Sequence, residues 1–161
     1  TAYFDRCELY SAGRNTEKKG YVTAASTPKG QKYGYVFRNC RFTGNSSRES
    51  VYLGRPWRDY ARTVLIDCYL GPHICREGWH DWDKKNARST LFYGEYASYG
   101  PGAGGQEAAD RYAAGQDAAG QDAADRGTSR PDWVFMLTRD QIQDYTMEQV
   151  LGGTDGWNPG A

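Results

Sequence analysis

The chain has 161 residues, enough for one domain with a core of its own. Its 20 basic and 20 acidic side chains give a net charge of zero, which argues against a nucleic-acid-binding protein, because such proteins need a basic surplus to meet phosphates. No apolar run reaches the roughly 20 residues that a membrane-spanning helix needs, so we expect no membrane segment.

The composition predicts short strands and many turns. The chain has 13 Tyr, 5 Trp, 5 Phe and 20 Gly, with few strong helix formers outside one segment. Aromatic faces on a rigid β-scaffold suit sugar rings, which pack on them. The chain opens at Thr1 in a strand-like segment, so we expect a processed or cut piece, and the lack of a leader says nothing about secretion.

Three windows repeat along the chain at intervals of about 30 residues. Each places a cysteine between apolar positions, in residues 2–9 (Cys7), 34–42 (Cys40) and 62–70 (Cys68). A second strand-like element recurs in residues 21–26, 51–55 and 91–96. Helical repeats would need a 3.6-residue apolar period, which is missing, and a propeller blade would be longer. The sequence therefore predicts an all-β chain folded as a parallel β-helix, in which each coil stacks on the one below.

In such a stack the cysteines at 7, 40 and 68 would form a buried column of packing groups. Three unrelated structural cysteines are the alternative. A disulfide between Cys68 and Cys75 around a short loop also stays open.

Beyond residue 100 the character of the chain changes. Residues 103–130 are rich in Ala and Gly and repeat GQEAA and GQDAA, which predicts a solvated, mobile insertion with little to bury. Thr138 and Gln141 then have the spacing of a capping box, and residues 140–151 read as one helix or two short pieces that end at Gly152. We expect the segment 138–151 to cap an open end of the solenoid.

Unusual residues are concentrated in VYLGRPWRDYARTV, residues 51–64. Arg55 leaves a strand beside Trp57, with Tyr60 close behind. An arginine can clamp a carboxylate and a tryptophan can carry a flat ring, a pairing that suits an acidic sugar. The alternative is an arginine stacked on Trp57 for packing alone.

A second cluster is HICREGWHDW, residues 73–82. His73 and His80 are too few for a metal site, so we expect none. Trp79 and Trp82 fit wall and surface positions of a coil. Because Trp82 follows Arg55 by about one coil, the two residues could share a groove.

These motifs resemble a known family. VYLGRPWRDYARTV, GYVTAAST, GWHDW, FYGEYASYGPGA and VLGGTDGWNP are similar to the C-terminal part of the catalytic domain of pectin methylesterases (pectinesterases), from Thr1 to about Ala103 and again from about Trp133. The resemblance implies a right-handed, single-stranded parallel β-helix without metal or cofactor. It also implies a secreted, extracellular hydrolase that is monomeric when intact, with pectin (homogalacturonan) of the cell wall as its partner.

The resemblance also implies a reaction, the hydrolysis of galacturonate methyl esters to pectate and methanol. One aspartate is the nucleophile, a second is general acid and then base, and a glutamine stabilises the oxyanion. Arg55 matches the catalytic arginine that holds the nucleophile ionised, and Trp57 matches the tryptophan that stacks on substrate. Tyr60 and Trp82 fall where the family lines its substrate groove.

Both aspartates of the family lie upstream of the segment that resembles TAYFDRCEL. Asp5, Asp59, Asp67 and Asp81 match neither, so we expect a fragment that turns over pectin negligibly and aggregates or folds poorly alone. A non-catalytic module that binds pectin through Arg55, Trp57 and Trp82 is the alternative from another class, and a purely structural solenoid is a third.

Overall fold

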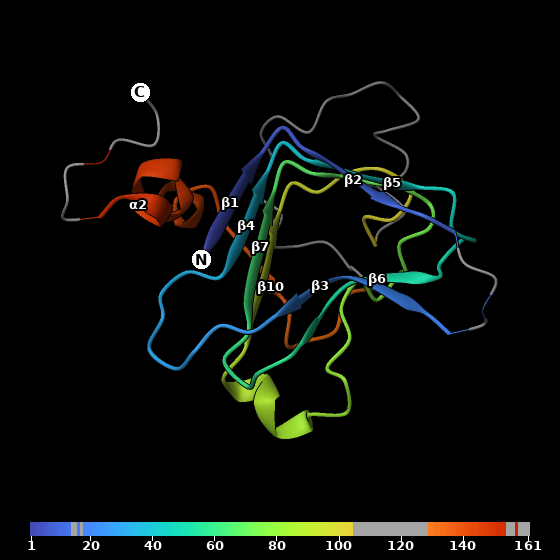
Figure 1. Cartoon of the computed structure of the whole chain (residues 1–161), viewed down its shortest axis with the longest axis horizontal. Helices are drawn as coiled ribbons and strands as arrows, with labels where there is room; N and C mark the ends of the chain where they lie inside the picture. The colour runs from blue at the N-terminus through green and yellow to red at the C-terminus, as the bar shows by residue number, and fades with distance from the viewer. Residues whose placement is uncertain (14–15, 17, 105–128, 154–156, 158–161) are drawn as a thin grey trace.

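Parallel strands stacked in three sheets make up the fold (Figure 1). The computed structural model describes residues 1–13, 16, 18–104, 129–153 and 157. Sheet A runs in the order β1-β4-β7-β9-β10, sheet B in the order β2-β5-β8, and sheet C pairs β3 with β6. Sheet A comprises β1 (Ala2–Asp5), β4 (Tyr35–Arg38), β7 (Arg62–Ile66), β9 (Phe92–Tyr96) and β10 (Phe135–Met136). Sheet B comprises β2 (Glu8–Ser11), β5 (Arg41–Gly44) and β8 (Tyr69–Leu70), and sheet C comprises β3 (Gly20–Ala25) and β6 (Val51–Pro56).

The first two coils contribute strands to sheets A, B and C in turn, the third contributes β7 and β8 to sheets A and B, and every pair of adjacent strands is parallel. The predicted parallel β-helix is therefore confirmed. Each cysteine window holds two strands, because a residue in the left-handed region, with φ 53°, bends the chain from sheet A into sheet B. Arg6, Asn39 and Asp67 occupy that position directly before the three cysteines.

The segment 91–96 belongs to a different series from the one predicted. It contains β9, which pairs with β7 in sheet A and not with β6 in sheet C. The partners that follow β6 are instead two isolated bridges, from Val51 to Ile74 and from Gly54 to Trp79. Ala97, with φ 50°, makes the same bend as in the cysteine windows, so the fourth winding places a serine where the others place cysteine.

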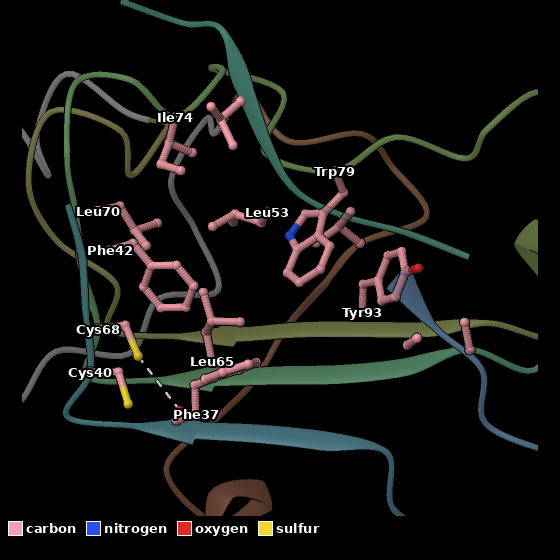
Figure 2. Packing of buried hydrophobic residues seen from close by; sticks show 14 of the residues in the cluster. Phe37, Cys40, Phe42, Leu53, Leu65, Cys68, Leu70, Ile74, Trp79 and Tyr93 are labelled. Carbon is pink, nitrogen blue, oxygen red and sulfur yellow. Dashed lines mark hydrogen bonds between the residues drawn. The ribbon is translucent and has the colours of Figure 1, made fainter. Parts of the chain in front are cut away.

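Cysteine and apolar ladders fill the interior of the coils (Figure 2). Cys40 and Cys68 are buried as predicted, and the Cys68 thiol donates to the Phe37 carbonyl at 3.5 Å. Cys7 is exposed, which corrects the predicted buried column, because no coil packs before the first. Cys68 and Cys75 are both free thiols and do not form a disulfide.

Leucines from sheets A, B and C form much of the core of the stack. Leu53, Leu65 and Leu70 are fully buried, and each contributes about 1.5–3 kcal/mol by leaving water. Trp79 stacks on Tyr93 with ring centroids 4.4 Å apart, which closes the core behind sheet C (Figure 2).

Two short helices are the last elements of the described chain: η3 (Gln141–Tyr145) and α2 (Met147–Leu151). The predicted capping box is present, since the Thr138 amide donates to Gln141 Oε1 at 2.9 Å and the Gln141 amide donates to Thr138 Oγ1 at 3.3 Å. Thr146 separates the helices and caps α2 through its hydroxyl.

The helices cover a face of sheet A and not an open end of the stack, in contrast to the expected cap. Val36 and Val64 point outward from sheet A, and they pack in clusters with Val150 and Ile142 respectively. Figure 1 shows α2 beside β1. The outer face of this sheet is apolar, so it gains more from burial than the edge does.

Most of the predicted insertion 103–130 lies outside the described residues. Its described ends meet at one point, where the Ser129 amide donates to the Gly104 carbonyl at 2.8 Å. A third short helix, η1 (Lys85–Ser89), follows the loop that carries Trp82. Among the described residues, no helix is long and apolar enough to cross a bilayer.

Candidate active site

Sheet C presents its outer face as the platform of the site. Its register places Tyr21 beside Tyr52 and Ala24 beside Arg55. The residue before Arg55 is Gly54, and there is no room for a side chain at this position between β3 and the ring of Trp79. A Cβ at this position would lie 2.2 Å from Thr23 Oγ1 and 3.0 Å from the Trp79 ring.

The Arg55 guanidinium lies between two aromatic rings. Its Cζ is 4.5 Å from the centroid of Tyr21 and 4.3 Å from that of Trp82. Its buried Nε has no hydrogen-bond partner among the residues that the structure describes. Two aromatic rings therefore contact this cation, and a guanidinium held against rings in this way can still bind an anion through its N–H groups.

Trp57 extends the same stack toward solvent. Its ring lies on that of Trp82 with centroids 5.4 Å apart and an interplanar angle of 23°, and 53% of the residue remains exposed. Lys84 fixes the local backbone by donating to the Trp57 carbonyl at 2.8 Å. The structure thus brings Arg55, Trp57 and Trp82 together on one surface, with Trp82 as the ring they share.

Tyr60 does not join this stack among the aromatic contacts of the described residues. Lys29 Nζ lies 5.7 Å from the centroid of its ring. The residue is only half-buried, so its ring is accessible from outside. Three of the four predicted site residues form one unit, and Tyr60 belongs to the flanking surface.

Tyr21 and His80 belong to the site although the sequence analysis did not select them. The Tyr21 hydroxyl lies 3.0 Å from His80 Nδ1, and the His80 ring stacks on Tyr52 with centroids 5.0 Å apart. Burial raises the pKa of Tyr21, and the neighbouring Arg55 charge partly offsets that rise. The alignment of residues 21–26 with 51–55 already held the signal, because it sets Tyr21 next to the strand that carries Arg55.

Asp59 and Asp81, the two aspartates that flank this site in sequence, are committed to cations. Asp59 pairs with Lys84 at 3.4 Å, and Asp81 Oδ2 pairs with Arg88 Nη2 at 2.7 Å. Burial would raise the pKa of Asp81, but hydrogen bonds from Arg88 and from the Asp83 amide hold it below its ordinary value. Both carboxylates are therefore paired with lysine or arginine and not with Arg55.

Asp5 and Asp67 are on the other side of the coil. Both belong to the bend from sheet A to sheet B, where Asp5 pairs with Arg6 at 2.8 Å. Burial raises the pKa of Asp67, and Arg38 partly offsets that rise. Among the described residues, no three His, Cys, Asp or Glu side chains gather as they would to bind a metal ion.

Comparison with protein families identifies one match. A family model described as Pectinesterase matches residues 1–126. Putative pectinesterase 11 of Arabidopsis thaliana is 28% identical over 160 residues, which cover 99% of this chain and 38% of that protein. Pectinesterase 31 of the same plant is 39% identical over 105 residues, which cover 64% of this chain and 31% of that protein.

Solved structures agree with the sequence comparison. Pectin methylesterase from carrot superposes with a TM-score of 0.71 at 27% identity, covering 94% of this chain and 44% of that one. A pectin methylesterase in complex with a hexasaccharide superposes with a TM-score of 0.64 at 28% identity, covering 99% of this chain and 46% of that one. The chain spans less than half the length of each of these relatives.

Proposed function

Because this chain belongs to the pectinesterase family, we propose that it supplies the arginine- and tryptophan-lined part of a site that demethylates pectin. Members of the family are carbohydrate esterases, and one solved relative is a complex with a hexasaccharide. The sandwich of Arg55 between Tyr21 and Trp82, with Trp57 stacked at its outer end, is the observation that carries the proposal.

The geometry suits a uronic acid chain. The exposed face of Trp57 can carry the apolar face of a sugar ring. Arg55 presents its N–H edge beside that ring, where it can form paired, charge-assisted hydrogen bonds with a carboxylate. Trp82 positions both groups, and Tyr60 extends the surface along the chain of sugars. A neutral polysaccharide would leave Arg55 without a partner, so we propose homogalacturonan as the ligand.

In the proposed reaction water cleaves the methyl ester of a galacturonate unit, giving the free carboxylate and methanol. A carboxylate nucleophile takes the acyl group and releases methanol, and water then frees the acid. Arg55 favours the ionised form of that nucleophile by its charge. Both aspartates of the family lie upstream of the segment that resembles TAYFDRCEL, so we propose that the reacting carboxylates come from outside these 161 residues.

We propose that the protein acts outside the cell, on cell-wall pectin. It needs no nucleic acid, membrane or cofactor, and we propose that the intact enzyme acts as a monomer.

Calorimetric titration of the chain with trigalacturonate and with its methyl ester tests this assignment. We expect binding of both, tighter for the free acid because its carboxylate meets Arg55. Arg55→Ala should weaken binding of the acid roughly tenfold or more, the loss of a charge-assisted hydrogen bond. Equal affinity of Arg55→Ala and the unchanged chain for trigalacturonate would contradict the role of Arg55.

A second candidate is a binding module without esterase activity. The commitment of Asp59 and Asp81 to lysine and arginine favours it for this chain taken alone. Methanol release from methylated pectin separates the two functions. We expect negligible release by the 161-residue chain. Release at a rate typical of enzymes, lost in Arg55→Ala, would show that a carboxylate of this chain reacts.

A further inference from the structure

His80 is placed where one ring nitrogen touches both walls of the arginine sandwich. The Tyr21 hydroxyl lies 3.0 Å from His80 Nδ1, and the Trp82 backbone amide donates to the same nitrogen at 3.3 Å. Tyr21 and Trp82 are the two residues whose rings enclose the Arg55 guanidinium. A single imidazole nitrogen therefore links two segments of the chain, β3 and the loop before η1.

The donors determine the protonation state of this histidine. A backbone amide can only donate, so Nδ1 must be unprotonated to accept from Trp82, and the proton of the neutral ring must then be on Nε2. The tyrosine hydroxyl can rotate to donate as well. A proton on Nδ1 would turn this acceptor into a donor and leave the Trp82 amide facing another N–H group. Tyr21 could adapt by accepting, but Trp82 could not.

We propose that His80 is a positioning residue. Its unprotonated Nδ1 holds Tyr21 and Trp82 against Arg55, and a proton on Nδ1 loosens the Trp82 wall and weakens the binding of a uronate. This inference rests on the proposed function for its ligand, but not for its geometry.

Charged groups surround His80 on several elements. Arg55 of β6 faces it across the Tyr21 ring, and Lys19 lies 4.9 Å above the Tyr52 ring on which His80 stacks. His80 also lines a pocket of about 280 Å³. The charged residues in its lining are Glu77, Asp81, Arg88 and Asp132.

The charged neighbours of His80 thus include both acidic and basic groups. The Asp81 carboxylate is shared with Arg88, which limits its pull on a proton at His80. Arg55 brings a positive charge to the same site, held against the Tyr21 ring. Tyr21 and Tyr52 contact the His80 ring directly, and burial raises the pKa of Tyr21.

Binding of trigalacturonate to the full chain at about pH 7.5 and about pH 5.5 tests the inference, because histidine is the side-chain type that most readily changes charge across this range, while the ligand carboxylates stay ionised. The unchanged chain should lose roughly three- to tenfold in affinity at the lower pH, as expected for one hydrogen bond. His80→Asn offers an amide oxygen in place of Nδ1 that cannot titrate, so its affinity should stay constant. His80→Phe keeps the ring on Tyr52 without an acceptor and should bind weakly at both values.

The backbone amide resonance of Trp82 gives a readout that needs no ligand. It should shift with pH in the unchanged chain and stay fixed in His80→Asn, which retains His73, the other histidine of the chain. Tyr21→Phe keeps the ring over Arg55 and removes only the hydroxyl, so it should lower affinity at the higher pH while the Trp82 resonance still titrates.

Two results would overturn the inference: an identical pH dependence of binding in the unchanged chain and His80→Asn, or a Trp82 amide that does not respond to pH. Failure of the proposed function looks different. The chain would then bind no trigalacturonate at either pH, and the titration of Trp82 would by itself support or overturn the positioning role of His80.

Discussion

The two rings that enclose Arg55 make its planar shape as important as its charge. We expect Arg55→Lys to weaken trigalacturonate binding roughly tenfold, because an ammonium cannot fill the slot between Tyr21 and Trp82 or bind a carboxylate through two N–H groups. Calorimetry measures the change. Arg41→Lys is the matched control, since Arg41 also stacks on a tyrosine, at 4.6 Å, but on sheet B. A similar loss in both variants would contradict a specific role for Arg55.

The buried His73 leads us to expect that the free energy of unfolding depends on pH. This histidine is buried, neither ring nitrogen has a hydrogen-bond partner in the described part of the chain, and burial lowers its pKa. The unfolded chain takes up a proton near pH 6.5, while the folded chain resists it until the pH is lower, so stability is complete above about pH 6.5 and falls as the pH drops below that value. Urea midpoints at about pH 7.5 and 5.5 should therefore differ.

The variants that assign this effect are His73→Leu and His80→Asn. We expect the pH dependence of the midpoint to shrink in the first and to persist in the second. A dependence that survives in His73→Leu would point to other titrating groups.

Glu95 is a carboxylate inside the core. It follows Phe37 and Leu65 in the register of sheet A, a position that is apolar in the other coils. Arg130 donates to both of its oxygens, at 2.8 and 3.2 Å, and the Trp79 indole donates to it at 2.7 Å. Both charged side chains are almost completely buried.

Removal of one charge from this buried pair should destabilise the fold strongly. Glu95→Gln leaves Arg130 without its counter-ion, and we expect the free energy of unfolding to fall by about 3–5 kcal/mol, as measured by urea titration. Glu49→Gln, which breaks an exposed pair with Arg76, should leave the midpoint nearly unchanged. Replacing both partners, as Glu95→Leu with Arg130→Met, should recover most of the loss. No recovery would show that the hydrogen bonds of Arg130 to the backbone dominate.

At the scale of elements, Gly104 and Ser129 lie side by side, although 24 residues separate them in the sequence. The Ser129 amide and hydroxyl both donate to the Gly104 carbonyl at 2.8 Å, and the hydroxyl also reaches the Arg76 carbonyl at 2.8 Å. These contacts do not depend on the residues in between.

We therefore expect that a short Gly-Asn link in place of residues 105–128 leaves the thermal midpoint within a few degrees of the unchanged chain, because it closes a smaller loop between the same anchors. Circular dichroism on heating measures this. A matched deletion of Ser129 with the linker retained should lower the midpoint. A large loss from the first deletion alone would mean that residues 105–128 contribute to the fold.

The segment 91–96 shows why the assignment of strands to sheets was incomplete. Its sequence, LFYGEY, lacks the cysteine that marked the other windows and resembles YVTAAS in its spacing. In the folded chain the decisive feature is the bend at Ala97, which a local pattern does not reveal. The sequence correctly predicted that this segment forms a strand. It did not reveal that the strand pairs with β7, because that depends on the number of residues in the coil between the two strands.

At the scale of the whole molecule, the first coil leaves three strand edges unpaired. β1, β2 and β3 are terminal in their sheets, and the apolar side chains of Phe4, Leu9 and Val22 are only partly buried. Such edges add strands from other molecules. We expect the isolated chain to self-associate through this end as its concentration rises, as measured by sedimentation velocity.

Val22→Lys should reduce this association by placing a charge on the edge. Phe135→Lys is the control, since Phe135 is exposed on β10 at the opposite edge of sheet A. Association that depends on Phe135 and not on Val22 would assign the contact to the other end of the stack.

The sequence by itself determined the repeat, the parallel β-helix and the family, because equivalent positions recur along a solenoid and motifs such as LGRPW are local. It also selected Arg55, Trp57 and Trp82, which lie together in the folded chain. Only the tertiary structure decided which residues enclose Arg55 and which carboxylates are already paired. Those contacts join residues of different coils through exact side-chain placement, which depends on register and on the length of each loop, and neither can be read from a local pattern.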